Sequence, residues 1–355
     1  MWNNDCIFVQ LYNYDSLFNG ITMNTYKILS FFICLGIALA SCKIYEPVSI
    51  QLLKPAQARI SPNVYKVILI NHSSYQKSSV VINGTNSSSA DNTDSIRTNQ
   101  YFSGLLDVLK NSPRYALVKK DVVFIEKPDY NSQYKSLEWS VIQSLCNENK
   151  ADAAVVLENY QVSYYYPIKI KQLQWGFYGS LEMQNGSLWK IYSVNPKQVT
   201  NDLLLKDTLF WDGSGEYESQ VLATIPPLND AIMQSCYYAG VKYGEHIAQS
   251  WQTQNRYLIT CENNDFITAI SYAKQNKWTE AVEIWKKYPY GKNIRLASFA
   301  AYNIAIASEA LDHIDIALEW AAKSYLLQQS EYTESYISTL ENRKIQNLII
   351  ENQLK

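Results

Sequence analysis

The last third of the sequence repeats itself at a spacing of 36 residues, and this repeat constrains its fold more than any other feature. Residues 277–285 (KWTEAVEIW) align with residues 313–321 (HIDIALEWA), and small residues recur at Ala281 and Ala317. Each unit has the apolar spacing of two amphipathic helices, with alanine where the helices would cross closely. We therefore predict an all-α domain over 264–355.

A third unit around 331–350 matches the pattern only weakly, so it is either a further repeat or a capping helix. Each unit of a repeat protein buries its apolar face against its neighbours, and fewer than three units are seldom stable alone. We therefore expect the helical domain to pack against the chain that precedes it.

Residues 61–258 show a different pattern, in which apolar strand-like runs alternate with helical ones. Strands are predicted at 64–71, 115–118 and 152–160, and helices at 96–111 and 137–145. Dense β-branched runs are typical of strands buried on both faces, and alternation with helices indicates crossover connections. The fold class predicted for the whole chain is α+β, a mixed α/β sheet domain followed by a C-terminal all-α helical repeat domain.

Residues 161–212 indicate antiparallel strands. Runs at 175–183 and 188–194 flank Asn185-Gly186, a strong hairpin signal, and 203–211 adds another strand. A helix is predicted at 228–253 from its apolar stripe. Segments without clear periodicity are predicted to be a tether over 42–60 and a long polar loop over 73–100.

The apolar run at 28–40 has 13 residues, too few for a helix that crosses about 30 Å of hydrocarbon. With Lys27 before it and small residues after it, the run is typical of a secretory signal. Met23 begins a normal signal of this kind, so we hypothesise that translation starts there and that 1–22 is not expressed. The signal region is 1–41.

Leu39-Ala40-Ser41-Cys42 resembles a bacterial lipobox. The resemblance implies cleavage before Cys42 and attachment of a diacylglycerol, with acyl chains such as palmitate, to its thiol. Two or three acyl chains hold a protein on a membrane, because each buried methylene contributes about 0.8 kcal/mol. An ordinary signal peptide, or a buried helix that contains a cysteine, is the alternative.

Composition excludes several function classes. The formal net charge of −2 argues against a nucleic-acid partner, and only three histidines occur. Cys146, Cys236 and Cys261 remain outside the signal and lipobox, and their spacing contains no CxxC pair, so neither zinc nor another cofactor is expected. An exported protein could form a disulfide among them, or keep them as buried thiols.

No set of residues has the spacing of a catalytic site, so we do not expect an enzyme. His72 follows a strand and is the one candidate for a hydrolase, although no nucleophile accompanies it. Tyr164-Tyr165-Tyr166 and Trp175 could stack on sugar rings, but core packing explains aromatic residues in strands equally well.

The order of elements in 60–255 is similar to the α/β domain of the curli-secretion lipoprotein family, through the strand Val67–Ile70, the helix at Leu105-Leu106 and the strand Val155–Leu157. The C-terminal units resemble tetratricopeptide repeats. With the lipobox, the whole resembles an uncharacterised lipoprotein family of Bacteroidota, for which no catalytic residues carry over. Asp94-Ser95-Ile96 and Asp207-Thr208-Leu209 resemble the O-glycosylation acceptor of exported proteins in that phylum, at Ser95 and Thr208.

These observations predict a lipid-anchored protein of the cell envelope.

 The predicted location of the protein is the outer membrane, on its periplasmic or surface face. The predicted role is a non-enzymatic scaffold that binds another envelope protein through the concave face of the helical repeats. Asn303 and Glu309 are the polar residues predicted to contact that partner. The alternative is a glycan-binding accessory lipoprotein of a nutrient-uptake system, with Trp175 as the sugar platform.

Overall fold

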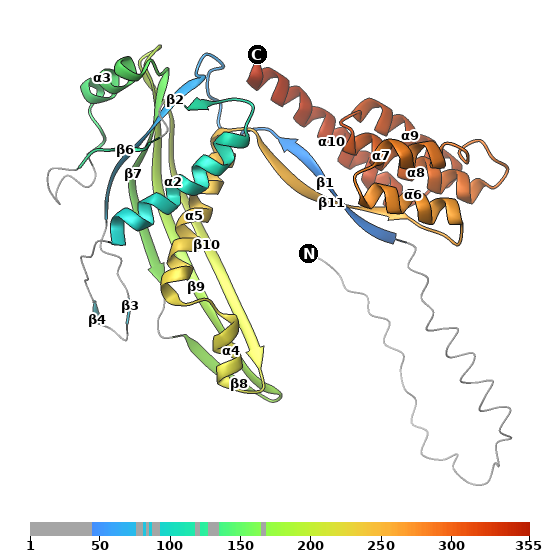
Figure 1. Ribbon diagram of the computed structural model, residues 1–355, viewed down its shortest axis with the longest axis horizontal. Coiled ribbons are helices and arrows are strands. Elements are labelled where there is room, and N and C mark those ends of the chain that lie inside the picture. Colours follow the sequence, from blue (N-terminus) through green and yellow to red (C-terminus); the bar gives the residue numbers. More distant parts are fainter. Residues whose placement is uncertain are drawn as a thin grey trace, which may run out of the picture.

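The computed structural model describes residues 45–75, 81–82, 85–86, 93–117, 121–126, 135–164 and 168–355. It has a sheet domain and a helical module, joined by a two-stranded ribbon (Figure 1). A mixed α/β sheet followed by C-terminal helices confirms the predicted fold class. The lipobox, Cys42 and the proposed start at Met23 lie outside the described residues.

The sheet domain is built on seven strands in the order β10-β9-β7-β2-β5, with β6 paired to β2 and β8 to β9. The strands β2, β5, β6 and β7 are parallel to one another, whereas β8, β9 and β10 are antiparallel to their neighbours. Their bounds are β2 Lys66–Tyr75, β5 Ala116–Leu117, β6 Val123–Phe124, β7 Ala153–Tyr164, β8 Lys169–Leu173, β9 Gly176–Ser193 and β10 Gln198–Gly215. A small separate pair, β3 Val81–Ile82 and β4 Thr85–Asn86, lies within the predicted polar loop.

Helices cover both faces of this sheet. On one face α2 (Thr93–Asn111) and α5 (Leu228–Ile247) pack over the main core, and α4 (Glu218–Thr224) covers its far end. On the other face α3 (Trp139–Asn149) packs over a smaller cluster that includes Ile68, Ile70 and Val156. Alternate residues of the parallel strands β2 and β7 therefore face apolar cores on both sides, which explains their continuous β-branched runs.

The helices α2 and α5 approach closely because glycine lies at their contact. A Cβ atom on Gly104 would lie 2.0 Å from the carbonyl oxygen of Tyr237, and one on Gly240 would lie 1.9 Å from that of Tyr101. No side chain larger than hydrogen fits at these points without moving a backbone.

The predicted tether is wrong for residues 45–54, which form strand β1 (Tyr45–Lys54). It pairs antiparallel with β11 (Ser250–Ile259) along its whole length. Every second residue of β1, namely Val48, Ile50 and Leu52, is buried against the helical module, and this alternation is the energetic reason for the strand. The helix predicted to reach 253 ends instead at Ile247, and β11 follows it.

The hairpin predicted at Asn185-Gly186 is also wrong, because β9 continues through both residues. Asn185 is buried there, where it accepts a hydrogen bond from the Tyr101 hydroxyl at 2.7 Å and donates to the Ser235 hydroxyl at 3.4 Å. These tertiary contacts replace the turn that the dipeptide favours locally. The chain reverses between β8 and β9 at Gln174-Trp175, and between β9 and β10 near a cis Asn195-Pro196 bond.

The helical module contains α6 (Asn264–Lys274), α7 (Trp278–Trp285), α8 (Ile294–Ala310), α9 (Ile314–Leu327) and α10 (Glu331–Leu354). The repeated units fold as the helix pairs α6–α7 and α8–α9, whose turns are equivalent. Asn276 and Asp312, 36 positions apart, have φ of 59° and 60°, a left-handed conformation that asparagine and aspartate tolerate. After them, Lys277 donates its N–H to the Tyr272 carbonyl and His313 to the Ser308 carbonyl.

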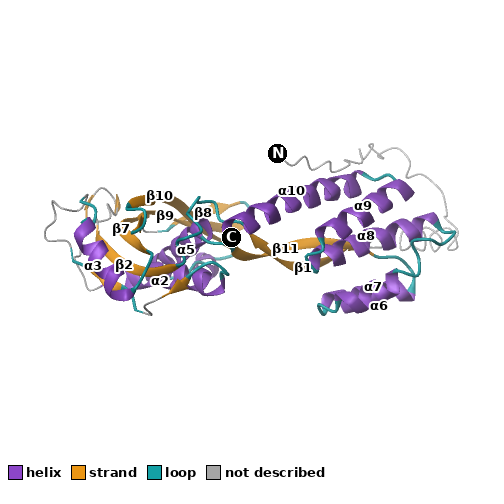
Figure 2. Cartoon of the chain, turned by 90° about the horizontal axis from the view of Figure 1, so that it is seen from above, coloured by secondary structure: helices purple, strands orange, loops and turns teal. Residues whose placement is uncertain are grey.

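The long helix α10 runs beside the ribbon and reaches the sheet domain, as Figure 2 shows. Near its end the Gln353 side chain donates to the Ala56 carbonyl at 2.8 Å and accepts from the Ala56 N–H at 3.0 Å. Arg114 of the sheet domain donates to the Gln353 carbonyl at 3.1 Å. The helical module is thus connected to the sheet domain by the ribbon and by the end of α10.

Candidate functional site

A groove of about 140 Å³ lies between the ribbon and α10. Tyrosine and hydroxyl side chains dominate its lining, which consists of Asn255, Arg256, Tyr257, Tyr302, Tyr332, Ser335, Tyr336 and Thr339. The α10 residues are spaced by three or four positions, so one face of that helix forms one wall. Strand β11 supplies the other wall, and Tyr302 of α8 lies at the base.

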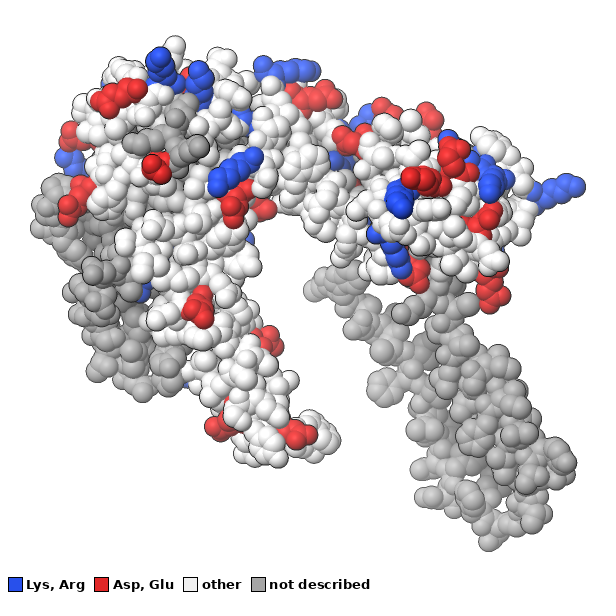
Figure 3. Space-filling model, viewed as in Figure 1, with Lys and Arg blue, Asp and Glu red and all other residues white. Residues whose placement is uncertain are grey.

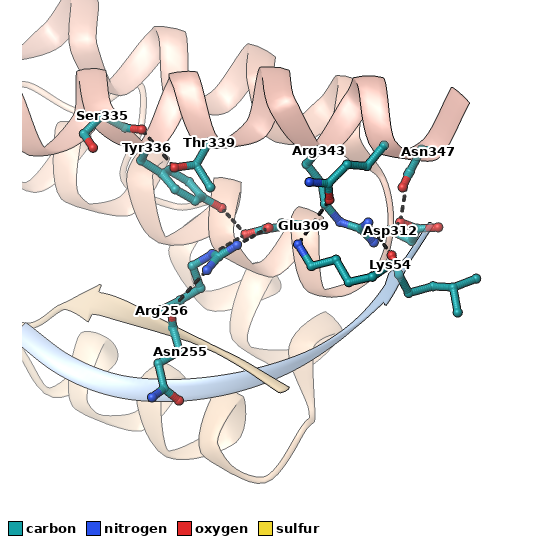
Figure 4. Close-up of polar contacts among 12 residues, drawn as sticks. Lys54, Asn255, Arg256, Glu309, Asp312, Ser335, Tyr336, Thr339, Arg343 and Asn347 are labelled. Carbon is teal, nitrogen blue, oxygen red and sulfur yellow. Dashed lines mark hydrogen bonds and ion pairs between the residues drawn. The ribbon is translucent and has the colours of Figure 1, made fainter. Parts of the chain in front are cut away.

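The floor of the groove is a buried ion pair (Figure 4). Arg256 donates from Nε to Glu309 Oε2 at 2.8 Å and from Nη2 to Glu309 Oε1 at 2.7 Å. The Tyr336 hydroxyl donates to Glu309 Oε2 at 2.9 Å. Because Glu309 is fully buried, these bonds replace the water that its carboxylate loses on folding.

Further cations surround this carboxylate. Burial lowers the pKa of Lys54, and the neighbouring Arg343 and Arg256 lower it further. Burial also lowers the pKa of Arg343, which donates to the Leu53 carbonyl at 2.6 Å. Glu309 is therefore the one fully buried anion in a group of three cations from β1, β11 and α10, within the part of the chain that the structure describes.

Tyrosine rings line the upper part of the groove in contact with one another. The ring centres of Tyr45 and Tyr332 are 4.9 Å apart, those of Tyr302 and Tyr332 are 5.5 Å apart, and those of Tyr302 and Tyr336 are 5.3 Å apart. Tyr45 and Tyr257 are 44% and 47% exposed. Burial raises the pKa of Tyr302, Tyr332 and Tyr336, so these phenols remain protonated and act as neutral hydrogen-bonding groups.

The groove has the residue types of a recognition surface. Tyrosine and arginine are enriched at protein interfaces, because they combine large apolar area with hydrogen bonding. The groove contains no cysteine or histidine among its lining residues. Within the described ranges, no group of three or more His, Cys, Asp and Glu side chains is placed to hold a metal ion.

The prediction that Asn303 and Glu309 contact a partner directly is wrong for this structure, because both side chains are fully buried. Asn303 accepts from the Ile259 N–H and donates to the Ile259 carbonyl, both at 2.8 Å, and so secures the end of β11. Glu309 lies beneath the groove and holds Arg256 in place. The repeat alignment located the right helix but could not show which of its faces β11 would cover.

Sequence reasoning missed Arg256 and the α10 tyrosines that do line the groove. Residues 250–259 alternate between exposed and less exposed positions in the structure, but their sequence, SWQTQNRYLI, does not alternate between apolar and polar residues. The sequence therefore contains little signal for β11, and the helix predicted through 253 covered its start.

The remaining predicted sites lie in separate places. Ser95 is exposed in the first turn of α2, and Thr208 is exposed on β10, so an enzyme could reach either side chain. Trp175 is 84% exposed at the β8–β9 turn. The lower end of the sheet domain is mostly uncharged on the face drawn in Figure 3, apart from acidic side chains at and near its tip. Tyr165 and Tyr166 lie outside the described residues.

The cysteines Cys146, Cys236 and Cys261 are free thiols in the structure. Burial raises the pKa of Cys146 to about 11 and that of Cys236 to about 12. Such thiols are almost entirely protonated near pH 7 and are poor nucleophiles.

His72 belongs to a buried polar cluster in the sheet domain. Its Nδ1 lies 2.7 Å from Glu158 Oε2, the Tyr192 hydroxyl donates to Glu158 Oε1 at 2.5 Å, and the Leu137 N–H donates to the same oxygen at 3.2 Å. Burial alone would raise the pKa of Glu158, but these hydrogen bonds outweigh it and lower the pKa. His72 is buried rather than at the surface, and its partner is a carboxylate that holds β2 to β7.

We expect Glu158→Gln to lower the free energy of unfolding by about 2 kcal/mol at pH 7, because it weakens hydrogen bonds to a buried carboxylate. The pKa of Glu158 is depressed in the folded state, so its contribution is present above the unfolded value, near 4.3, and is lost as pH falls through the folded pKa. Denaturant titrations should show the difference from the wild type shrinking below about pH 4. Glu148→Gln, at an exposed position of α3, is the control, and a difference that stays constant with pH would contradict the assignment.

A second concave region of about 620 Å³ lies on β7, β9 and β10 and is lined by Gln161, Ser163, Gln184, Asn185, Gly186, Lys206, Asp207 and Thr208. Cross-strand pairing places Gln161, Gly186 and Lys206 in one row and Ser163, Gln184 and Thr208 in the next. A Cβ atom on Gly186 would have no heavy atom within 4 Å. The absence of a side chain at this position therefore contributes to the concave shape. We call this region the polar hollow.

Comparisons with known proteins identify domains rather than an activity. Residues 64–258, more than half of the chain, match the family model described as Domain of unknown function (DUF8603). Residues 267–342 match the model described as Domain of unknown function (DUF6340). No curated protein matches the sequence.

Solved structures similar to part of this chain share little sequence with it. A putative neuraminyllactose-binding hemagglutinin homolog from Helicobacter pylori has 8% identity and a TM-score of 0.30, covering 55% of this chain and 88% of that one. The hypothetical protein CT253 from Chlamydia trachomatis has 10% identity and a TM-score of 0.23, covering 52% and 97%. Lipoprotein GNA1162 from Neisseria meningitidis has 7% identity and a TM-score of 0.15, covering 50% and 96%.

A membrane-spanning helix would need to be both long and strongly apolar. None of the helices in the described parts of the chain meets both conditions.

Proposed function

We propose that this chain, which belongs to the family of Domain of unknown function (DUF8603), is a lipid-anchored scaffold of the cell envelope that binds another protein. The observation that carries the proposal is the tyrosine-lined groove between β11 and α10, with exposed Tyr45 and Tyr257 at its rim. The proposed anchor is Cys42, by its resemblance to a lipobox, and the proposed membrane is the outer one.

The position of the groove fits this role. Cys42 precedes Tyr45 by three residues, which span at most about 11 Å when fully extended. The Tyr45 ring contacts Tyr332 in the groove wall. An acylated Cys42 would therefore hold the groove close to the bilayer surface, where a second envelope protein would meet it. The resemblance of the helical module to tetratricopeptide repeats and that of the whole to a Bacteroidota lipoprotein family are parts of the same proposal.

Affinity capture from detergent-solubilised envelopes tests the proposal. The wild type should recover a stoichiometric partner, and the double variant Tyr257→Ala/Tyr332→Ala should recover at least tenfold less of it, because the groove loses two of its rings. Tyr217→Ala, which removes a 63% exposed tyrosine on the sheet domain, is the matched control. In parallel, Cys42→Ser should move the protein from the membrane fraction to the soluble fraction.

Two results would contradict the scaffold role. One is the recovery of no stoichiometric partner by the wild type, and the other is equal recovery by the groove variant and the control. Retention of the Cys42→Ser variant in the membrane fraction would contradict the anchor separately.

Glycan binding is the second candidate function, and the polar hollow is the observation that favours it. Its amide, hydroxyl and ammonium groups suit sugar hydroxyls, although Trp175 lies apart from them at the β8–β9 turn. Binding on a glycan array that is lost in Trp175→Ala or Gln184→Ala would select this function over the scaffold.

A further inference from the structure

Strand β10 is an unusually open edge of the main sheet. It has 18 residues and pairs only with β9 among the described strands. Gly213 is its single buried residue, whereas alternate residues of β9 are buried along most of that strand. Figures 1 and 2 both show β10 along the margin of the sheet. A long edge of this kind leaves one row of backbone N–H and C=O groups available to another strand.

Edge strands are usually protected from pairing by proline, several charges, bulges or short length. Strand β10 has no proline and one irregularity at its start, between Val199 and Asn201. Its charged residues are Asp202, Lys206, Asp207 and Asp212, of which Asp207 is already paired with Lys242 of α5. Its outward face instead presents Leu204 and Phe210, which are 55% and 56% exposed. Leu203, Leu205 and Trp211 on the opposite face pack only partly into the core.

We propose that β10 pairs antiparallel with β10 of a second copy of this chain, about a twofold axis at Leu204. In this register Leu204 faces its own copy, and Lys206 faces Asp202 of the second copy on each side of the axis. On the core side, Leu203 faces Leu205 of the second copy. Two like subunits joined by the same strand form a closed symmetric pair with one continuous sheet.

Charge selects this register. An axis at Asp202 or Lys206 would place like charges directly opposite, which destabilises a strand pair. An axis at Leu203 or Leu205 would give no pair of opposite charges. An axis at Leu209 would oppose Lys206 to Asp212, but it would also oppose Asp207 to Trp211 at the end of the strand that α4 contacts.

The charged groups are available for these contacts. The Asp202 carboxylate lies 3.0 Å from Lys190 Nζ and its side chain is still 53% exposed. Lys206 is exposed and forms no ion pair with the residues that the structure describes. Pairing would place Asp202 of the second copy opposite Lys206 and would cover Leu204.

Cysteine cross-linking of the full chain in detergent tests the pairing, in a Cys261→Ser background that removes the partly exposed thiol. Leu204→Cys should give at least tenfold more cross-linked dimer with a short bis-maleimide than Phe210→Cys. Residues directly opposite in an antiparallel pair have Cα atoms about 5 Å apart, whereas two copies of residue 210 would be separated by roughly 40 Å along the strands. The two positions share a face and nearly the same exposure, so intrinsic reactivity is matched.

Lys206→Glu should lower the dimer fraction measured by light scattering at least tenfold, because it opposes Asp202 of the second copy. A monomeric mass at all protein concentrations would overturn the proposal, as would equal cross-linking at positions 204 and 210. Stronger cross-linking at 210 than at 204 would overturn the register. Circular dichroism of each variant checks that the sheet is intact, and Lys171→Glu on β8, which lies on the other side of β9 from β10, is the charge control.

Discussion

Replacing Glu309 with alanine is expected to lower the free energy of unfolding of the helical module by about 4 kcal/mol. The change leaves Arg256 without its carboxylate in the neighbourhood of two further cations, Lys54 and Arg343, and it deprives the Tyr336 hydroxyl of its acceptor. Removing one member of a buried ion pair costs much more than the pair contributes net, because the remaining charge stays desolvated. Urea titration followed by fluorescence of the buried Trp278 and Trp285 measures the effect.

The controls separate charge from packing. Glu319→Ala removes an exposed carboxylate on α9 and should change the free energy of unfolding by less than about 0.5 kcal/mol. Tyr336→Phe keeps the packing and loses one hydrogen bond, for about 1–2 kcal/mol. Unfolding of Glu309→Ala at the same urea concentration as Glu319→Ala would show that the buried pair does not hold the ribbon to the helices.

Replacing Gly240 with alanine is expected to destabilise the sheet domain by about 3 kcal/mol, although alanine is the better helix former by about 1 kcal/mol. The new methyl group would lie 1.9 Å from the Tyr101 carbonyl oxygen, so α2 and α5 must move apart. The sign of the effect is the test, because helix propensity alone predicts stabilisation. Thermal unfolding followed by circular dichroism measures it.

Gly186→Ala is the matched control, since a Cβ atom there meets no heavy atom within 4 Å. Its stability should stay within about 0.5 kcal/mol of the wild type or rise slightly, because alanine is also favoured over glycine in a strand. If Gly240→Ala were as stable as Gly186→Ala, the helices α2 and α5 would have to be less tightly packed than their glycines indicate.

The sequence predicted elements that depend on local pattern, and it failed where distant segments decide the structure. The repeat at 36 residues predicted both helix pairs, because the same buried alanines recur in each. Strand β1 was taken for a tether because its partner β11 is about 200 residues away, although Val48, Ile50 and Leu52 alternate as a strand should. Asn185-Gly186 misled for the same reason, since Tyr101 and Ser235 fix Asn185 inside a strand.

The groove was harder to predict than the fold. Its walls come from β11 and α10, and its floor from α8, so no short stretch of sequence contains it. Asn303 and Glu309 were predicted as polar residues that contact a partner in the repeat groove. Their role as buried partners of Ile259 and Arg256 follows only from the pairing of β11 beside them.

The ribbon also constrains the order in which the parts of the chain can fold. Ser49 and Asn255, which face each other across it, are 206 positions apart in the chain. Contacts of such large sequence separation form late and slow folding, because a long loop must close first. Residues 45–54 must therefore remain unpaired until the sheet domain has been made and β11 has followed it. A chaperone that shields residues 45–54 during this interval would raise the yield of folded protein.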